Sequence, residues 1–128
     1  MSTFSITIEV ASAENGHFES IEALVDTGAS HTIFPGRFLR NLGIEPTERW
    51  PFRLADESQR EYGVGQARLR IVGRERVNTV VFGDDDMTAL LGAVTLEDYR
   101  LGVDPVGERL VPVPGLLMGL LGSNPSPA

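Results

Sequence analysis

The sequence predicts an all-β fold, and three observations support this class. Apolar and polar residues alternate from Phe4 to Val10, which is typical of a strand with one buried face. The chain has 14 Gly and 8 Pro among its 128 residues, so turns are frequent for its length. Valine, isoleucine and threonine, which favour strands, are common. A chain of this length is expected to form one domain around a modest core.

Strands and tight turns are expected to alternate through the first half of the chain. Asn15-Gly16 is a strong hairpin signal, and residues 18–25 form the expected second strand. Apolar spacing over residues 36–43, ending near Gly43, predicts a short helix or turn. The polar residues 55–60 then separate the two strands of a later hairpin. The other strands expected in this half cover residues 32–34, 50–54 and 62–72.

A short helix and a final strand are expected near the end of the domain. Gly73-Arg74 turns the chain into a strand over residues 77–82. Thr95 is suited to cap a short helix over residues 96–100. A last strand is expected near residues 109–113. Residues 1–118 are expected to form the domain, and residues 119–128 a disordered tail.

The composition excludes several classes of function. A net charge of −7 leaves no strongly basic surface for nucleic acid, and the absence of Cys excludes disulfides and thiolate chemistry. Residues 1–5 lack the basic start and apolar run of a signal peptide. The apolar stretch at residues 115–122 is far too short to span a bilayer. We therefore expect a cytoplasmic protein with no nucleic-acid or membrane partner.

Asp26 is the candidate catalytic residue, because an apolar strand delivers its carboxylate onto a turn that contains Gly28. Glycine lets the backbone turn tightly and approach a neighbour closely. Thr27 can orient the turn through its hydroxyl, and Ala29 and Ser30 are small enough to pack beneath it. An Asp-Thr-Gly tripeptide alone is a weak signal, since it also forms ordinary Asx turns. The apolar strand before it and the extended segment after it strengthen the signal.

The segment at residues 24–34 resembles the active-site segment of the retropepsin-like aspartic proteases, in which Asp-Thr-Gly-Ala-Ser follows an apolar run. That family also carries an apolar-apolar-Gly segment before its C-terminal helix, and Leu90-Leu91-Gly92 matches it. The resemblance covers roughly residues 4–113 and indicates a single-domain, bacterial-type member. It implies a closed, barrel-like β domain with one short C-terminal helix.

The resemblance implies hydrolysis of peptide bonds by two carboxylates in a homodimer. Two carboxylates held close together share one proton, so one activates water while the other polarises the scissile carbonyl. This chain has one Asp-Thr-Gly motif, so a second copy would supply the partner of Asp26. Thr27 would bond the main chain of the opposite subunit, and Gly28 would help to position water and substrate. The implied partner is a polypeptide substrate, and no cofactor or metal is implied.

The resemblance also implies a β-hairpin flap that covers the substrate. The candidate is the polar turn at residues 55–60, with Ala55, Asp56, Glu57 and Ser58 as its substrate-binding residues. Viral relatives have Gly-rich flap tips, whereas this tip is acidic and polar. Gly63 and Gly65 are interpreted as flap hinges or bulge glycines.

Several alternatives stay open at this point. The chain could be a retropepsin-like dimerisation or peptide-binding module with little or no proteolysis, or an unrelated β-barrel for a small ligand. His31 either tunes the carboxylate pair or reaches the substrate, or it is a surface or half-buried strand residue. Asp84-Asp85-Asp86 is either a cation site or a solvated loop. Trp50 and Tyr62 line either a substrate subsite or the hairpin core.

Overall fold

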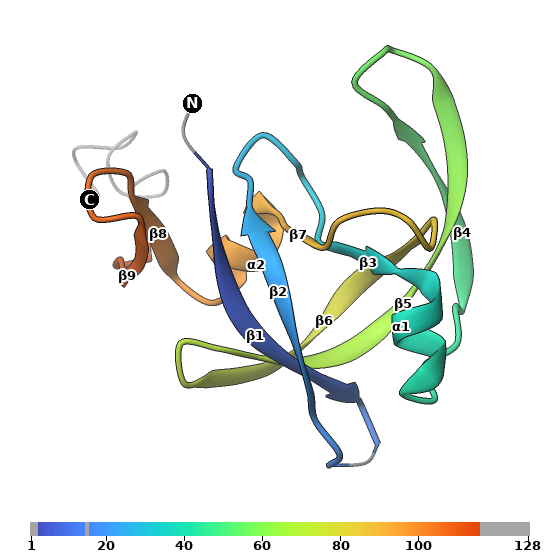
Figure 1. Cartoon of the computed structure of the whole chain (residues 1–128), viewed down its shortest axis with the longest axis horizontal. Helices are drawn as coiled ribbons and strands as arrows, with labels where there is room; N and C mark the ends of the chain where they lie inside the picture. Colours follow the sequence, from blue (N-terminus) through green and yellow to red (C-terminus); the bar gives the residue numbers. More distant parts are fainter. Residues whose placement is uncertain (1–2, 15, 116–128) are drawn as a thin grey trace, which may run out of the picture.

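The computed structural model describes residues 3–14 and 16–115, which form nine strands and two short helices (Figure 1). The strands are β1 Phe4–Ser12, β2 Glu19–Val25, β3 Ile33–Pro35, β4 Glu48–Arg53, β5 Gln59–Ile71, β6 Arg74–Gly83, β7 Leu90–Leu91, β8 Leu101–Asp104 and β9 Arg109–Pro112. The helices are α1 Gly36–Asn41 and α2 Ala93–Asp98. The expected all-β class is therefore confirmed, and no helix among the described residues is long and apolar enough to cross a membrane.

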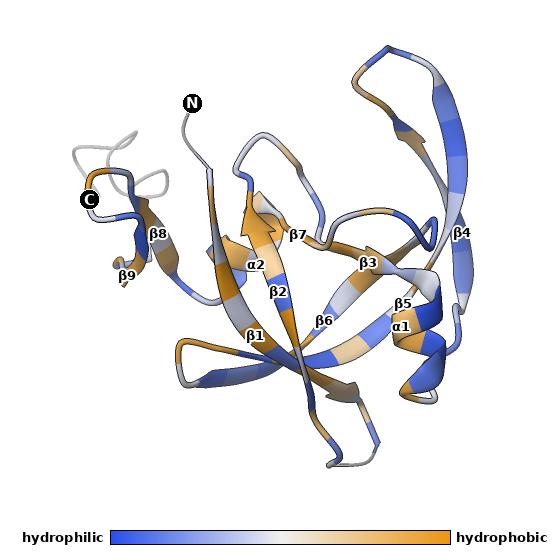
Figure 2. Cartoon of the chain, in the orientation of Figure 1, coloured by the Kyte–Doolittle hydropathy of each residue, from blue (hydrophilic) through white to orange (hydrophobic). Residues whose placement is uncertain are grey.

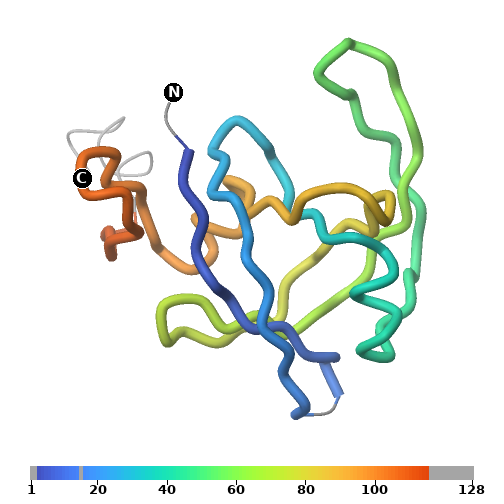
Figure 3. The backbone as a smooth tube through the Cα atoms, in the orientation of Figure 1, coloured from blue at the N-terminus to red at the C-terminus, as the bar shows by residue number. Residues whose placement is uncertain are grey.

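Seven of the strands form one sheet that closes on itself. The strand order is β1-β2-β7-β3-β6-β5-β4, and β1 also pairs with β5, so six strands make a ring and β4 extends outside it. The strand β5 is long enough to serve three neighbours, because β4 pairs with its first part, β6 with most of it, and β1 with its end. The tube in Figure 3 shows the β4–β5 hairpin rising away from the ring. The expected barrel-like closure thus takes the form of this ring.

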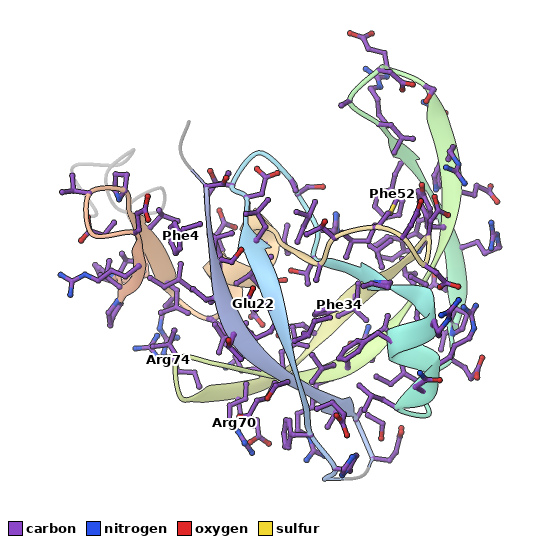
Figure 4. The ribbon with its side chains drawn as sticks, viewed as in Figure 1. Phe4, Glu22, Phe34, Phe52, Arg70 and Arg74 are labelled. Atoms are coloured by element: carbon purple, nitrogen blue, oxygen red, sulfur yellow. The ribbon has the colours of Figure 1, made fainter. Side chains whose placement is uncertain are left out.

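The core fills the inside of the ring. Alternation along β1 buries Phe4, Ile8 and Val10, as the sequence predicts. The core also includes Phe34, which Figure 4 labels beside α1, and Leu39 from α1 itself. Figure 2 shows apolar residues on β1, β2 and β3, and hydrophilic residues along the outer part of the β4–β5 hairpin. The hairpin therefore stands largely in solvent while the ring holds the core.

The two-residue strand β7 determines where the candidate motif lies. It runs parallel to β2, with Leu24 opposite Leu90 and Val25 opposite Leu91. On its other side it pairs antiparallel with β3, where Ile33 faces Leu90. Because β7 lies between them, β2 and β3 are separated, and the loop that joins them must cross the end of β7. That loop contains the Asp-Thr-Gly segment.

The elements near the C-terminus differ from the prediction. The helix α2 begins at Ala93 rather than after Thr95, so Thr95 lies buried inside the helix and does not cap it. The short strand β8 was not predicted, whereas β9 agrees with the strand expected near residues 109–113. Residues 36–43 do contain a short helix, α1, in addition to the expected C-terminal one. The predicted tail at residues 119–128 lies outside the described residues.

Gly63 and Gly65 lie where two segments pack closely, and neither forms a bulge. The pairing of β5 with β6 runs through both positions without interruption. A Cβ at Gly63 would lie 2.8 Å from Pro46 Cβ, and a Cβ at Gly65 would lie 2.9 Å from the carbonyl oxygen of Glu45. The segment before β4 therefore crosses β5 at a distance that only glycine permits.

Candidate active site

Asp26 directly follows β2, a strand that pairs with β1 on one side and with β7 on the other. Its backbone N–H donates a hydrogen bond to the carbonyl oxygen of Leu91 at 3.1 Å, which continues the pairing of β2 with β7 by one residue. Val25, the residue before it, is buried, whereas Asp26 is half-buried. The core strand thus holds the backbone of Asp26 firmly and presents its carboxylate at the boundary between core and solvent.

The turn after Asp26 orients the carboxylate. Gly28 N–H donates to Asp26 Oδ1 at 2.9 Å, and Ala29 N–H donates to the carbonyl oxygen of Asp26 at 3.1 Å. This is an Asx turn of the kind that the sequence favours. Thr27 and Gly28 are exposed, while Ala29 is half-buried beneath the turn. Asp26, Thr27, Gly28, Ala29 and Ser30 therefore form one continuous loop, as expected.

The start of α2 anchors this loop from below. The first backbone N–H groups of a helix have no partner within the helix and need an external acceptor. Here Ala93 N–H donates to Ala29 O at 2.8 Å, and Val94 N–H donates to Ser30 O at 2.9 Å. Gly92 provides no side-chain cap for the helix, and the loop carbonyls take the place of one. The Leu90-Leu91-Gly92 segment thus lies against the Asp26 loop.

Gly92 is required at this junction for a steric reason. A Cβ at this position would lie 2.6 Å from both the carbonyl carbon and the oxygen of His31. Both of these are backbone atoms, which cannot rotate away as a side chain would. The loop and β7 can therefore pack this closely only because residue 92 has no side chain.

An open cleft of about 520 Å³ lies above the loop. Its floor is the loop itself, including Asp26, Ala29 and Ser30. Apolar side chains from the ring and from the β4–β5 hairpin form its walls, and Asp26 is the only carboxylate among its lining residues in the part of the chain that the structure describes. The remaining lining residues are Gly28, His31, Ile33, Phe52, Arg53, Leu54, Ala55, Tyr62, Val81, Met87 and Leu90.

His31 connects the floor of the cleft to the hairpin. Its ring contacts Trp50 and Phe52 edge-on, with ring centroids 5.8 and 5.7 Å apart. Its Nδ1 atom shares a hydrogen bond with Ser30 Oγ at 2.9 Å. Figure 4 labels Phe52 on the inner side of the hairpin. His31 is half-buried, but it lies before β3 and not in a strand, and it lines the cleft. Its aromatic contacts are a feature that the sequence did not suggest.

The candidate flap residues lie at the tip of the β4–β5 hairpin. Ala55 lines the cleft, whereas Asp56, Glu57 and Ser58 are exposed and do not line it. Asp56 Oδ1 accepts hydrogen bonds from Ser58 N–H at 3.0 Å and Ser58 Oγ at 2.6 Å, and these bonds lower the pKa of the Asp56 carboxyl. Glu57 has a positive φ of 71°, as a tight turn requires. The polar turn is also shorter than expected, because β5 begins at Gln59.

Phe52 and Met87 are cleft residues that the sequence did not single out, whereas Tyr62, one of the two subsite candidates, does line the cleft and Trp50 does not. Phe52 and Tyr62 come from facing strands of the hairpin, and Met87 comes from the loop before β7. Alternation along residues 50–54 does place Trp50 and Phe52 on one face, so that signal was available. Nothing in the sequence indicates that Met87 approaches this face.

The acidic loop after β6 makes ion pairs on the surface. Asp84 pairs with Arg60 of the hairpin at 3.2 Å, and Asp85 pairs with Arg37 of α1 at 3.4 Å. Among the residues that the structure describes, no group of three or more His, Cys, Asp or Glu side chains is placed to hold a metal ion. The loop therefore agrees with the solvated interpretation of this aspartate run.

Comparison with known proteins identifies the fold and the family. A retropepsin-like aspartic protease from Rickettsia conorii aligns with a TM-score of 0.51 and 24% identity, over 80% of this chain and 88% of that one. The retroviral protease-like domain of Ddi1 from Leishmania major aligns with a TM-score of 0.54 and 16% identity, over 82% and 85% of the two chains. The EIAV protease in complex with the inhibitor HBY-793 aligns with a TM-score of 0.52 and 16% identity, over 86% and 93%.

No curated protein sequence matches the chain. A family model described as "gag-polyprotein putative aspartyl protease" matches residues 11–98, which is more than half of the chain and includes both the Asp26 loop and β7. The matched region ends at the last residue of α2. The chain therefore belongs to the gag-polyprotein aspartyl protease family and has the retropepsin-like fold.

Proposed function

We propose that the protein is an aspartic endopeptidase that is active as a homodimer, with one Asp26 carboxylate from each subunit. One observation carries the proposal above all. In a chain of this family, Asp26 is the only carboxylate among the described residues that line the cleft, and the remaining lining is mainly apolar. An isolated carboxylate of this kind has the position of a catalytic group but lacks the partner that the chemistry needs.

The chemistry follows from bringing two such carboxylates together. Two like charges a few ångströms apart cannot both form easily, so the pair holds one proton over a range of acidic to neutral pH. The ionised carboxylate removes a proton from water, and the protonated one donates to the scissile carbonyl oxygen. The apparent pKa values then belong to the pair and not to either residue. A single subunit has no such pair.

Two features of the loop support assembly around Asp26. Thr27 and Gly28 are exposed in the single chain, so a second loop can approach them. The loop is also held rigidly by β7 and α2, so it does not have to reorganise when a partner arrives. A two-fold arrangement would place equivalent residues of both copies face to face. Thr27 would then bond the partner's main chain, and Gly28 would admit the substrate and the catalytic water.

The β4–β5 hairpin is proposed as the flap that closes over an extended polypeptide. The hairpin contributes Phe52, Leu54, Ala55 and Tyr62 to the cleft, so its base already forms one wall. The apolar lining would suit apolar side chains beside the cleaved bond. Asp56, Glu57 and Ser58 would contact only substrate segments that leave the cleft, because they are exposed at the tip.

The substitution Asp26→Asn tests the proposal. The asparagine amide oxygen can still accept the Gly28 N–H bond, so the turn should persist while the ionisable group is lost. Cleavage of a mixed peptide library should fall below detection, while circular dichroism and sedimentation should remain those of the wild type. Asp104→Asn is a matched control. The Asp104 carboxylate also accepts turn N–H groups, from Val106 and Gly107, but it lies in the β8–β9 hairpin.

Mixing the two proteins tests whether the site is shared between subunits. If each active site needs two Asp26 carboxylates, a dimer of one wild-type and one Asp26→Asn subunit is inactive. Equal amounts of the two proteins, once their subunits have exchanged, should therefore have about a quarter of the activity of the same total amount of wild type. Activity that falls only in proportion to the wild-type fraction would contradict the shared site. If the wild type cuts no peptide but binds peptides in the cleft, the protein is the binding module that the sequence also allows.

A further inference from the structure

Tyr62 carries a polar group that the folded chain leaves without a partner. The residue is 5% exposed, and its hydroxyl oxygen is shielded from solvent. No residue in the described ranges, 3–14 and 16–115, makes a hydrogen bond to it. A buried hydroxyl with no partner costs free energy relative to phenylalanine, which would present the same ring without the oxygen. The oxygen is thus unfavourable for folding alone.

The position of Tyr62 connects this oxygen to the cleft. Tyr62 on β5 lies opposite Trp50 on β4, so both side chains are on one face of the hairpin. On the same face, Val64 of β5 lies opposite Val81 of β6. Tyr62 and Val81 both line the cleft above Asp26. The residue that carries the hydroxyl therefore belongs to the wall where a peptide would lie, and the shielded oxygen lies behind the surface of that wall.

The ring of Tyr62 is held on two sides. Phe52 lies across the hairpin with ring centroids 6.2 Å apart. The guanidinium of Arg60 stands over the ring, 5.1 Å from its centroid, and is itself paired with Asp84. The charge of Arg60 is therefore already balanced, and a substrate group would find a fixed phenol rather than a free cation. A fixed donor loses little freedom when it binds.

Two other polar side chains on the floor of the cleft each make a hydrogen bond within the chain. Asp26 Oδ1 accepts from Gly28 N–H, and Ser30 Oγ shares its hydrogen bond with His31. The hydroxyl of the second tyrosine of the chain, Tyr99, is also hydrogen-bonded, as is usual for a buried hydroxyl. Its hydroxyl donates to Leu69 O at 2.6 Å and accepts from Arg76 N–H at 3.1 Å. Among the described residues, the other buried side-chain atom without a partner is Asn78 Oδ1, and Asn78 does not line this cleft.

We infer that Tyr62 is a specificity-determining residue that donates a hydrogen bond to an amide side chain, glutamine or asparagine, of a bound peptide. An amide oxygen accepts from the phenol without adding charge, which suits a protein of net charge −7 better than a carboxylate does. Lysine and arginine have no acceptor to offer. The ligand reaches the oxygen after a neighbouring side chain moves, and Met87, which packs in the same cluster, is unbranched and adaptable. The inference rests on the proposed function for its peptide ligand.

Binding to a catalytically blocked protein tests the inference without relying on cleavage. Trp50 is the only tryptophan and lies in the same cluster as Tyr62, so its fluorescence should report peptides in the cleft. The probes are pairs of peptides that differ by glutamine or methionine at one position, scanned along an apolar sequence. Asp26→Asn should bind the glutamine member about tenfold more tightly at one position, and Asp26→Asn/Tyr62→Phe should lose this preference.

Thermal unfolding of the free protein provides a second, matched readout. Tyr62→Phe removes an unpaired oxygen, so its melting temperature should equal or exceed that of the wild type. Tyr99→Phe removes a hydroxyl with two backbone partners and should melt lower. A Tyr62→Phe protein that melts as low as Tyr99→Phe would show that a buried water or another group satisfies the hydroxyl, and would overturn the inference.

The outcomes separate the inference from the proposed function. An unchanged glutamine preference in the double variant, or no glutamine preference at any position, overturns the role of Tyr62. Loss of the preference together with an unchanged or raised melting temperature of Tyr62→Phe supports it. If the peptides bind in this way but the wild type never cleaves them, the proposed protease function fails while the role of Tyr62 in recognition stands.

Discussion

Thr32 and Thr95 share a buried hydrogen bond between their hydroxyl oxygens, 2.7 Å apart, although 63 positions separate them in the chain. Thr32 Oγ1 also accepts the backbone N–H of Gly92 at 3.0 Å. Both threonines are almost fully buried. One side chain therefore ties the end of the Asp26 loop to the end of β7 and to α2. The loop that carries the candidate catalytic residue and the helix beneath it form a single unit.

The substitution Thr32→Val should destabilise the protein strongly for so small a change. Valine has nearly the same shape but leaves the Gly92 N–H and the Thr95 hydroxyl buried without a partner. We expect the free energy of unfolding to fall by roughly 1–3 kcal/mol, measured by urea denaturation. Thr32→Ser keeps the hydroxyl and should recover most of this loss. Equal stability of the valine and serine variants would contradict the assigned hydrogen bonds.

Gly92→Ala should disturb the Asp26 loop directly. The added Cβ would lie 2.6 Å from the backbone of His31, so the loop or β7 must shift. We expect a loss of stability of about 1–3 kcal/mol and a larger loss of any peptidase activity. Gly16→Ala is the matched control, because a Cβ at Gly16 meets nothing within 4 Å. Wild-type behaviour of Gly92→Ala in both assays would refute the steric argument.

Alkaline pH should destabilise the protein through Tyr99. Burial, the largest cause, raises the pKa of the Tyr99 hydroxyl in the folded state above its ordinary value. The unfolded chain then loses this proton first, so the contribution of Tyr99 is fully present below about pH 10 and declines as the pH rises further. Urea denaturation between about pH 8 and pH 11 should show this decline. In Tyr99→Phe the slope should be smaller, and an identical slope would exclude Tyr99 as its source.

The ion pair of Arg60 with Asp84 should restrain the hairpin without adding much global stability. Both side chains are about half exposed, and surface pairs of this kind contribute at most about 1 kcal/mol. Arg60→Gln should therefore leave the urea midpoint nearly unchanged but increase hydrogen exchange of the β4–β5 amides, as higher salt should in the wild type. Arg49→Gln is a control, because Arg49 pairs with Glu61 within the same hairpin. Equal exchange in all three proteins would exclude a restraining role.

Local patterns predicted most of the strands and the position of the candidate loop. Alternation at Phe4–Val10 identified both β1 and its buried face. The Asp26 turn was predicted from residue types whose conformational preferences are local. A threonine before acidic residues suggests a helix cap, and at Thr95 this local reasoning was wrong. In the folded protein its hydroxyl bonds Thr32 instead.

The sequence by itself determined the class of fold, the Asx turn at Asp26 and the identity of the two segments that resemble an active site. Only the tertiary structure decided that β7 lies between β2 and β3, that Gly92 meets the backbone of His31, and that Tyr62 lines the cleft with its hydroxyl unpaired. The physical reason is that periodicity and turn preferences depend on neighbours in the chain and report which face is buried. Which distant residue covers that face depends on strand order, and strand order is determined by packing of the whole domain.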